Sequence, residues 1–407
     1  MASVSAAAGE KQAAQDLETP PPAEPAALRT GLRARLRRPH LAVDKHLLRL
    51  WLRDVILPII AIRIAIMVAG YFALTVFQPE RLSEGLAMWN HWDGPNFQIL
   101  SQWGYGPGTP RPEFIVLFPL YPLTISIGNA VLPLFETAML SSLVATLFAG
   151  VGLYELVRLD SNRSLARGSV LAMVLFPSAY SLVAPYSEPL FLATTVWAFV
   201  AMRRGHVAAS GVLALLAALT RIQGAFLIPA LGVEYLMVRR RIRWDILWIA
   251  LIAAGPLIYL GINWYYFGSP MHFVSVQDQI YHVANGMPWV TMPDLWNHVV
   301  NEPQNERWVT VFVAPLAAFV LLAVVTIWSI FSKHSRPSYA VYTAITGLSF
   351  TTLTWPISVP RYIMGVFPIF IAMASWGRRP GGQAVLVLST LLLGMFMTLF
   401  LMLHWAF

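Results

Sequence analysis

Apolar segments of the length that a membrane helix needs recur along almost the whole chain. A spanning helix requires about 17–25 predominantly apolar residues, and the pattern predicts eleven such spans, several of them short. Their approximate limits are 54–77, 137–158, 169–185, 187–203, 206–221, 224–238, 244–266, 309–332, 337–355, 360–376 and 383–405. The segment 114–133 is also apolar, but two prolines interrupt it, so we expect a re-entrant or interfacial element there. The pattern predicts an all-α polytopic membrane protein.

The first 53 residues follow a different pattern. Residues 1–28 are rich in Ala, Glu, Gln and Pro and lack apolar periodicity, which predicts a disordered tail. Residues 29–53 contain eight Lys and Arg residues mixed with leucine, which is typical of a basic juxtamembrane helix beside anionic lipid. The first apolar run begins only near residue 55, so we expect no cleavable signal peptide.

Composition agrees with a membrane protein. Of the 407 residues, 57% are hydrophobic and 12% are charged, whereas a soluble protein carries about 25% charged residues. We therefore expect residues 54–407 to form one membrane domain. The chain contains no cysteine, which excludes disulfides, thiolate metal sites and thiol nucleophiles.

The distribution of basic residues predicts the orientation of the spans. With a cytoplasmic N-terminus, every basic cluster falls on the cytoplasmic side, as the positive-inside rule requires. These clusters lie at 158–167, 203–204, 239–243, 333–336 and 378–379. The C-terminus and two long loops, 78–113 and 267–308, are then external. The net charge of +8 is thus explained by topology, and we expect no nucleic-acid partner.

Unusual polar residues collect on the predicted external face. They are His91, Trp92, Asp93 and Glu113 in the first loop, Tyr186 and Glu188 at one turn, Arg221 and Gln223 at a second, Arg361 and Tyr362 at a third, and Asp278 in the long loop.

Asp93 is the first candidate, because a carboxylate at the membrane edge is costly to desolvate and is usually kept for chemistry or for a cation. The alternative is a solvated loop residue that caps a helix. Arg221 and Arg361 have the geometry to grip a substrate phosphate, although arginines also extend to lipid phosphates. Glu188 can hold Arg221 or contact a substrate. Arg63 lies within a span, where an unpaired cation is costly, so we expect it to pair with a protein partner or with a lipid phosphate.

A metal site is not expected from these residues. His91 and Asp93 form a His-x-Asp pair, but two ligands do not complete a site. We expect neither a divalent metal nor another cofactor.

Six short motifs follow one another at compatible spacing. They are Trp92-Asp93 with Phe97, Phe118-Pro119-Leu120-Tyr121-Pro122, Phe176-Pro177, Ala184-Pro185-Tyr186-Ser187-Glu188, Ala218-Leu219-Thr220-Arg221 and Pro360-Arg361-Tyr362. In this order they resemble the PIG-V-like mannosyltransferases, which include the enzyme that adds the second mannose to the GPI anchor. The resemblance covers residues 54–376. The chain departs from that pattern at Gln223, near the position where a proline often follows the Thr-Arg pair.

The resemblance implies a GT-C type glycosyltransferase with about eleven transmembrane helices and an extracytoplasmic active site. It implies transfer of mannose, with inversion, from a polyprenyl-phosphate donor to a lipid or glycan acceptor. Asp93 would be the general base, and the other polar residues of the external face would bind substrate. The small loops and compact length favour a bacterial member, which would reside in the plasma membrane; a eukaryotic one would reside in the ER membrane.

Two other classes of protein remain open. A transporter or lipid flippase would show inverted repeats and ionisable residues near the bilayer midplane. A non-catalytic GT-C-like assembly subunit would keep the fold without the chemistry.

Overall fold

The computed structural model describes residues 45–406. The predicted tail 1–28 and residues 29–44 of the basic segment lie outside the described residues. The chain divides into two compact units, Met1–Leu48 and Arg49–Phe407. The description below concerns the second unit, to which the helix α2 (Lys45–Trp51) leads.

Within residues 45–406 the protein is helical, with an isolated bridge between Asn285 and Leu353 in place of any strand. The α-helices are α3 (Leu57–Phe77), α4 (Asp93–Trp103), α5 (Leu120–Gly128), α6 (Leu134–Arg158), α7 (Arg163–Val174), α8 (Glu188–Arg203), α9 (Val207–Thr220), α10 (Leu227–Arg239), α11 (Leu247–Ala250), α12 (Ala254–Phe267), α13 (His272–Gln279), α14 (Pro288–Asn301), α15 (Ala314–Phe331), α16 (Pro337–Phe350), α17 (Val359–Tyr362), α18 (Pro368–Trp376) and α19 (Gln383–Leu401).

Short 3-10 or π-helical turns connect or extend these helices. They are η2 (Leu52–Ile56), η3 (Pro79–Trp89), η4 (Pro112–Val116), η5 (Ala179–Leu182), η6 (Ile222–Phe226), η7 (Trp244–Ile246), η8 (Leu251–Ala253), η9 (Trp308–Val313) and η10 (Ile363–Gly365).

Six helical segments of the described chain are long and apolar enough to cross a membrane. They are Lys45–Phe77, Leu134–Arg158, Ile222–Arg239, Trp244–Phe267, Trp308–Phe331 and Gln383–Leu401. A bent pair, Val359–Gly365 with Pro368–Trp376, would be a seventh. The all-α membrane fold is therefore confirmed, but the predicted count of eleven spans is not.

Prolines account for two of the differences. The predicted span 169–185 ends early, because α7 stops at Val174 and Pro177 follows. The predicted span 360–376 is broken by a 90° bend before Pro368. Proline lacks the backbone N–H and disfavours helix in the residue before it. The segment 114–133 contains the nine-residue α5, about 14 Å long at 1.5 Å per residue, so it does not cross a core of about 30 Å.

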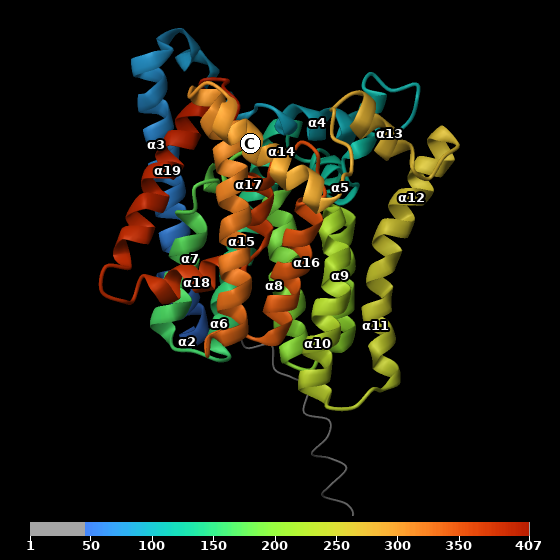
Figure 1. Ribbon diagram of the computed structural model, residues 1–407, viewed down its shortest axis with the longest axis vertical. Helices are drawn as coiled ribbons and strands as arrows, with labels where there is room; N and C mark the ends of the chain where they lie inside the picture. The colour runs from blue at the N-terminus through green and yellow to red at the C-terminus, as the bar shows by residue number, and fades with distance from the viewer. Residues whose placement is uncertain (1–44, 407) are drawn as a thin grey trace, which may run out of the picture. The chain divides into compact units, whose positions relative to one another are not determined.

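The helix α8 is the buried centre of the bundle and packs between α6 and α9 (Figure 1). Its sequence is apolar on all sides, which is the pattern of a fully enclosed helix, and 13 of its 16 residues are buried. Charged residues occur only at its two ends, Glu188 and Arg203. Each end of α8 therefore needs its own counter-ions.

At the Arg203 end, the basic connections meet in an ion-pair cluster. Arg203 donates to both oxygens of Asp160 at 2.6 Å. The buried Glu234 lies 2.9 Å from Arg336 Nη2 and 3.3 Å from Arg203 Nε. Three of the predicted cytoplasmic connections thus share one end of the unit, whereas α4, α13 and α14 of the predicted external loops lie at the other (Figure 1).

Arg63 finds its partners in backbone carbonyls. It lies within α3, is 9% exposed, and donates to Leu182 O at 2.6 Å and to Val183 O at 2.9 Å. Leu182 ends the short η5 and Val183 follows it, so no next helical turn supplies N–H donors to these two carbonyls. The buried guanidinium therefore replaces helical pairing where α7 ends early.

We expect Arg63→Met to lower the thermal stability of the purified protein. Methionine fills similar volume but donates nothing, so Val183 O loses its partner while Leu182 O keeps the Thr146 hydroxyl at 3.3 Å. An unpaired buried acceptor costs about 1–3 kcal/mol. Thermal midpoints in one detergent measure the loss. The neighbouring, lipid-facing Ile64→Met is the control, and equal midpoints for both variants would contradict the assignment.

The predicted orientation is open to test because the chain has no native cysteine. Trp103 ends α4 and Arg241 follows α10, two helices at opposite ends of the unit (Figure 1), and both residues are exposed. We expect an impermeant thiol reagent added to intact cells to label Trp103→Cys but not Arg241→Cys, and to label both after permeabilisation. The reverse pattern would invert the topology.

Candidate active site

Four charged residues from four different segments meet at the predicted external end. Asp93 is the first residue of α4, Glu188 the first of α8, Arg221 follows α9, and Arg361 lies in α17. The partial positive charge of a helix N-terminus favours an acidic residue in the first turn. Both carboxylates therefore occupy positions that stabilise a negative charge.

Ion pairs link these residues in a chain. Arg361 Nη2 donates to Asp93 Oδ2 at 2.6 Å, and Arg361 Nε lies 3.1 Å from Glu188 Oε1. The same Glu188 oxygen lies 2.7 Å from Arg221 Nη1, which also donates to Ser187 Oγ at 3.3 Å. Asp93, Arg361, Glu188 and Arg221, called the charge quartet below, carry two charges of each sign.

Exposure differs along the quartet. The side chains of Glu188 and Arg361 are 3% and 5% exposed, that of Arg221 is 14% exposed, and that of Asp93 is 31% exposed. The inner pair is sealed in protein, whereas Asp93 reaches open space. Within residues 45–406 its Oδ1 has no hydrogen-bond partner. One oxygen of Asp93 is thus free to meet a ligand.

Tyrosine rings cover the two guanidiniums. The Arg361 guanidinium carbon lies 4.9 Å from the ring centre of Tyr186 and 5.5 Å from that of Tyr362. Tyr362 also lies 4.4 Å from Arg221. Such cation–π contacts strengthen when water is excluded. They hold the planar guanidiniums in fixed orientations.

The turn before α4 is shaped to present Asp93. Trp92 has φ 56° and ψ −111°, a backbone conformation that costs about 1–3 kcal/mol for a non-glycine residue. Its ring packs edge-on against Trp405, with 5.2 Å between centres. A Cβ on Gly94 would lie 2.9 Å from Pro185, so only glycine permits this approach.

The quartet opens onto a cavity of about 680 Å³. Its charged lining is Asp93, Arg221 and Arg361, and Trp92, Gln223 and Tyr362 also line it. The structure therefore brings six of the predicted site residues to one cavity. Glu188 and Tyr186 lie behind the arginines and contact them.

Amide side chains form part of the remaining wall. Asn96, Gln223, Gln277 and Asn285 line the cavity from four separate segments. Within the described chain none of these four side-chain amides has a hydrogen-bond partner. Each amide offers two donors and one acceptor. Trp355 and Trp405 add aromatic faces to the same wall.

Three predicted site residues lie elsewhere. Glu113 does not line the cavity and pairs with Arg111 at 2.7 Å. Asp278 is exposed to solvent, whereas its neighbour Gln277 lines the cavity. His91 also lies outside the cavity, with its Nε2 2.8 Å from Arg81 Nη2.

Other lining residues gave no signal in the sequence. Asn96, Asn285 and Trp405 are ordinary polar or aromatic residues in loops or near helix ends, and no spacing distinguishes them. Tyr281 belongs to the same group. Tyr281 is 38% exposed, and the partial burial of its hydroxyl, together with nearby Glu113 and Asp93, raises the pKa of that hydroxyl to about 12. The Tyr281 hydroxyl therefore stays protonated and can donate at neutral pH.

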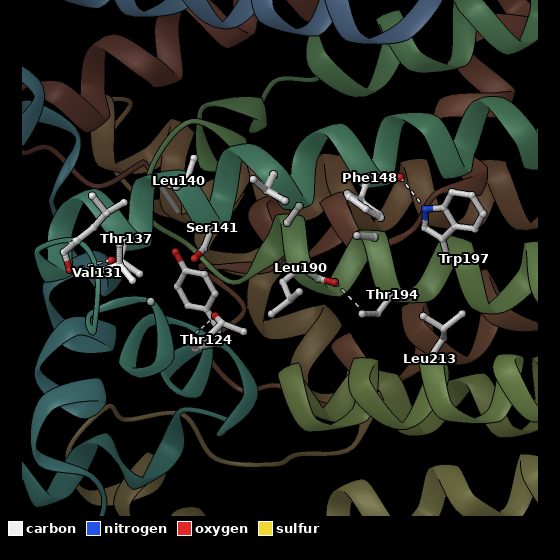
Figure 2. A pocket seen from close by; sticks show the side chains of 16 residues that line it. Thr124, Val131, Thr137, Leu140, Ser141, Phe148, Leu190, Thr194, Trp197 and Leu213 are labelled. Atoms are coloured by element: carbon white, nitrogen blue, oxygen red, sulfur yellow. Dashed lines mark hydrogen bonds between the residues drawn. The ribbon is translucent and has the colours of Figure 1, made fainter. Parts of the chain in front are cut away.

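A second cavity, of about 730 Å³, lies between α5, α6, α8 and α9. Its lining is almost wholly apolar (Figure 2), and Trp197 and Thr194 satisfy their polar groups on the carbonyls of Phe148 and Leu190. Tyr121 of this cavity packs edge-on against Phe97 of the charged cavity, with 4.9 Å between ring centres. The two cavities approach each other at this pair.

The described residues contain no group of three His, Asp or Glu side chains that could hold a metal ion. The candidate site is thus built from the charge quartet, the amides and the aromatic rings.

Comparisons with known proteins identify no family for this chain. No protein-family model and no curated protein matches the chain. Among solved structures, the crystal structure of ArnT from Cupriavidus metallidurans bound to undecaprenyl phosphate is similar, with a TM-score of 0.44 and 15% identity. The match covers 69% of this chain and 53% of ArnT, so the chain spans about half the length of that protein. A likeness at this level does not bear on activity, and membership of the PIG-V-like family stays a prediction from the motifs.

The contact between His91 and Arg81 predicts a pH-dependent stability. Burial, and then the Arg81 charge, lower the pKa of His91. The unfolded chain therefore binds more protons than the folded one as pH falls through about 6.5, and stability decreases there. We expect the thermal midpoint to fall between pH 7.5 and pH 5.5.

The variant His91→Gln provides the comparison. A glutamine amide oxygen can accept from Arg81 but does not titrate, so its midpoint should fall less over the same range. Parallel curves for the two proteins would exclude His91 as the source.

Proposed function

We propose that the chain is a membrane glycosyltransferase of GT-C type that uses a polyprenyl-phosphate sugar as donor. The charge quartet beside an open cavity is the observation that carries this proposal. Two guanidiniums held by one buried carboxylate suit a phosphate, because arginine matches phosphate geometry with paired donors. A partly exposed carboxylate beside them suits a general base.

The rest of the cavity suits a sugar. Unpaired amides can exchange hydrogen bonds with hydroxyl groups, and aromatic faces can pack against a sugar ring. This wall is uncharged at Gln277, Asn285 and Trp355, which favours neutral hydroxyl-rich groups over charged ones. Mannose as the sugar, and a lipid or glycan as the acceptor, are the finer parts of the proposal and rest on the motif resemblance.

The reaction follows from these roles. The acceptor hydroxyl lies near Asp93 Oδ1 and loses its proton to that oxygen. The acceptor oxygen attacks C1 of the sugar from the face opposite the phosphate, and the bond between C1 and the phosphate oxygen breaks. The products are an inverted glycoside and polyprenyl phosphate. Arg221 and Arg361 stabilise the charge that develops on the leaving phosphate.

A transporter or flippase is the main alternative. It would carry functional charges at mid-depth, whereas Arg63 within α3 is bound by backbone carbonyls. The other buried charged side chains are all paired. Glu188 and Arg361 lie at one end of α8 and Glu234 at the other, whereas Asp54 and Glu155 pair with Arg163 and Arg204 of the predicted cytoplasmic connections. This distribution favours an enzyme with its site at one end.

We expect Asp93→Asn to slow transfer at least about 100-fold, the lower end of the effect of a positioned base. The variant should still bind polyprenyl phosphate, since both arginines remain. The measurement incubates protein in lipid nanodiscs with labelled polyprenyl-phosphate mannose and a membrane lipid extract, and follows labelled product. Asp294→Asn, an exposed aspartate in α14, is the matched control and should transfer normally.

Three outcomes of this measurement distinguish the role of Asp93, the transferase and the flippase. Near-normal transfer by Asp93→Asn would exclude Asp93 as the base while leaving the enzyme class in place. A wild-type protein that binds polyprenyl phosphate but yields no glycoside from any acceptor fraction would overturn the transferase proposal. Movement of the lipid across the bilayer without product would support a flippase.

A further inference from the structure

Glu188 lies between Arg221 and Arg361 and pairs with both. Its Oε1 contacts Arg221 Nη1 at 2.7 Å and Arg361 Nε at 3.1 Å. The residue is 2% exposed and begins the most enclosed helix of the unit. It is absent from the cavity lining. Glu188 therefore acts on the arginines and does not reach the contents of the cavity.

Arg361 has two counter-ions of different kinds. Glu188 is sealed in protein, whereas Asp93 stands at the cavity surface and binds the outer nitrogen Nη2 at 2.6 Å. An incoming anion can compete for Nη2 but not for Nε. The quartet is neutral, with two charges of each sign. A bound phosphate adds a third negative charge, so the two arginines no longer need both carboxylates as counter-ions. Asp93 is the one that can leave.

We propose that Glu188 is a positioning residue that fixes both guanidiniums, and that the donor phosphate takes the place of Asp93 on Arg361. Both carboxylate oxygens of Asp93 would then be free only when the donor is bound. This inference rests on the proposed function and adds an order of events to it.

The charges of this exchange balance through the reaction. The donor phosphodiester carries one negative charge, and Asp93 carries another. As the acceptor oxygen bonds to C1 and the bond from C1 to phosphate breaks, the proton moves to Asp93 and neutralises it. The phosphate leaves as a monoester with two negative charges. The total is unchanged, and Arg361 already faces the phosphate that gains the charge.

The chain contains a matched control for Glu188. Glu234 is also fully buried and also bridges two arginines, Arg336 at 2.9 Å and Arg203 at 3.3 Å. It lies at the opposite end of α8, away from the cavity. Glu234 also accepts hydrogen bonds from Ser338 Oγ and Arg336 Nε. The variants Glu188→Gln and Glu234→Gln each remove a buried charge that bridges two arginines, and they differ in whether those arginines face the cavity.

We expect Glu188→Gln to separate binding from turnover. Its site gains one net positive charge, so its Kd for polyprenyl phosphate should fall severalfold relative to wild type. Arg361, with one counter-ion lost, holds Asp93 more tightly and is positioned less well. Its kcat should therefore fall at least about tenfold, within the 100-fold that a misplacement of about 1 Å costs. Glu234→Gln should change neither quantity per folded molecule.

Three other results would overturn the inference. A raised donor KM with an unchanged Kd for polyprenyl phosphate would mean that Glu188 touches the sugar. Equal kinetic effects of the two variants would mean a structural role only. An unchanged kcat for Glu188→Gln would exclude positioning. In each case transfer by the wild type would leave the proposed function standing, whereas its absence would remove that function first.

A second measurement uses the wild type alone, so it does not depend on the folding of a variant. A water-soluble carbodiimide modifies free carboxylates, and mass spectrometry reports the rate at Asp93 relative to the exposed Asp294. If polyprenyl phosphate displaces Asp93 from Arg361, the lipid should raise this ratio. A ratio that stays constant or falls with added lipid would contradict the exchange.

Discussion

The buried carboxylate of Glu188 between two guanidiniums is the interaction on which the candidate site depends. Removing charges from water is costly, and a buried pair is tolerated only where geometry and further contacts compensate. Here the start of α8 stabilises the acid, tyrosine rings cover the arginines, and Asp93 supplies the second negative charge. Without Glu188, Arg221 would lose its carboxylate partner and Arg361 would keep Asp93 alone as counter-ion.

The enclosure of α8 explains why ion pairs occur at both of its ends. A helix that is apolar on all sides is held by packing and cannot turn a charge toward solvent. Its terminal residues, Glu188 and Arg203, must therefore find partners from other helices. At one end, Asp160, Arg203, Glu234 and Arg336 form ion pairs with one another. The other uses the same combination of charges but leaves one carboxylate at a cavity.

Much of this arrangement follows from local sequence, and some of it does not. The apolar runs predict the helical membrane fold, and the prolines predict an interrupted segment at 114–133 but not the early end of α7. The motifs predict that Asp93, Arg221 and Arg361 share a site, yet they do not reveal that Asp93 binds Arg361 across 268 positions of sequence. The partners of Arg63 are backbone carbonyls, which no side-chain pattern can indicate. Among the lining amides, Asn96 and Asn285 give no signal in the sequence for the same reason, since only the folded chain leaves them without partners.

In the proposed exchange Arg361 holds the base, Asp93, until the donor phosphate binds, and this limits the activation of water. An unoccupied cavity of this size admits solvent, and a free carboxylate beside a bound activated sugar could as readily activate water as an acceptor hydroxyl. While Asp93 is held by Arg361, its Oδ2 is occupied and the carboxylate is fixed in orientation. In the proposed exchange, donor binding would release the base beside C1 at the moment when the sugar itself fills the space. The donor would thus exclude water and free the base in one event, because Arg361 binds either Asp93 or the donor phosphate.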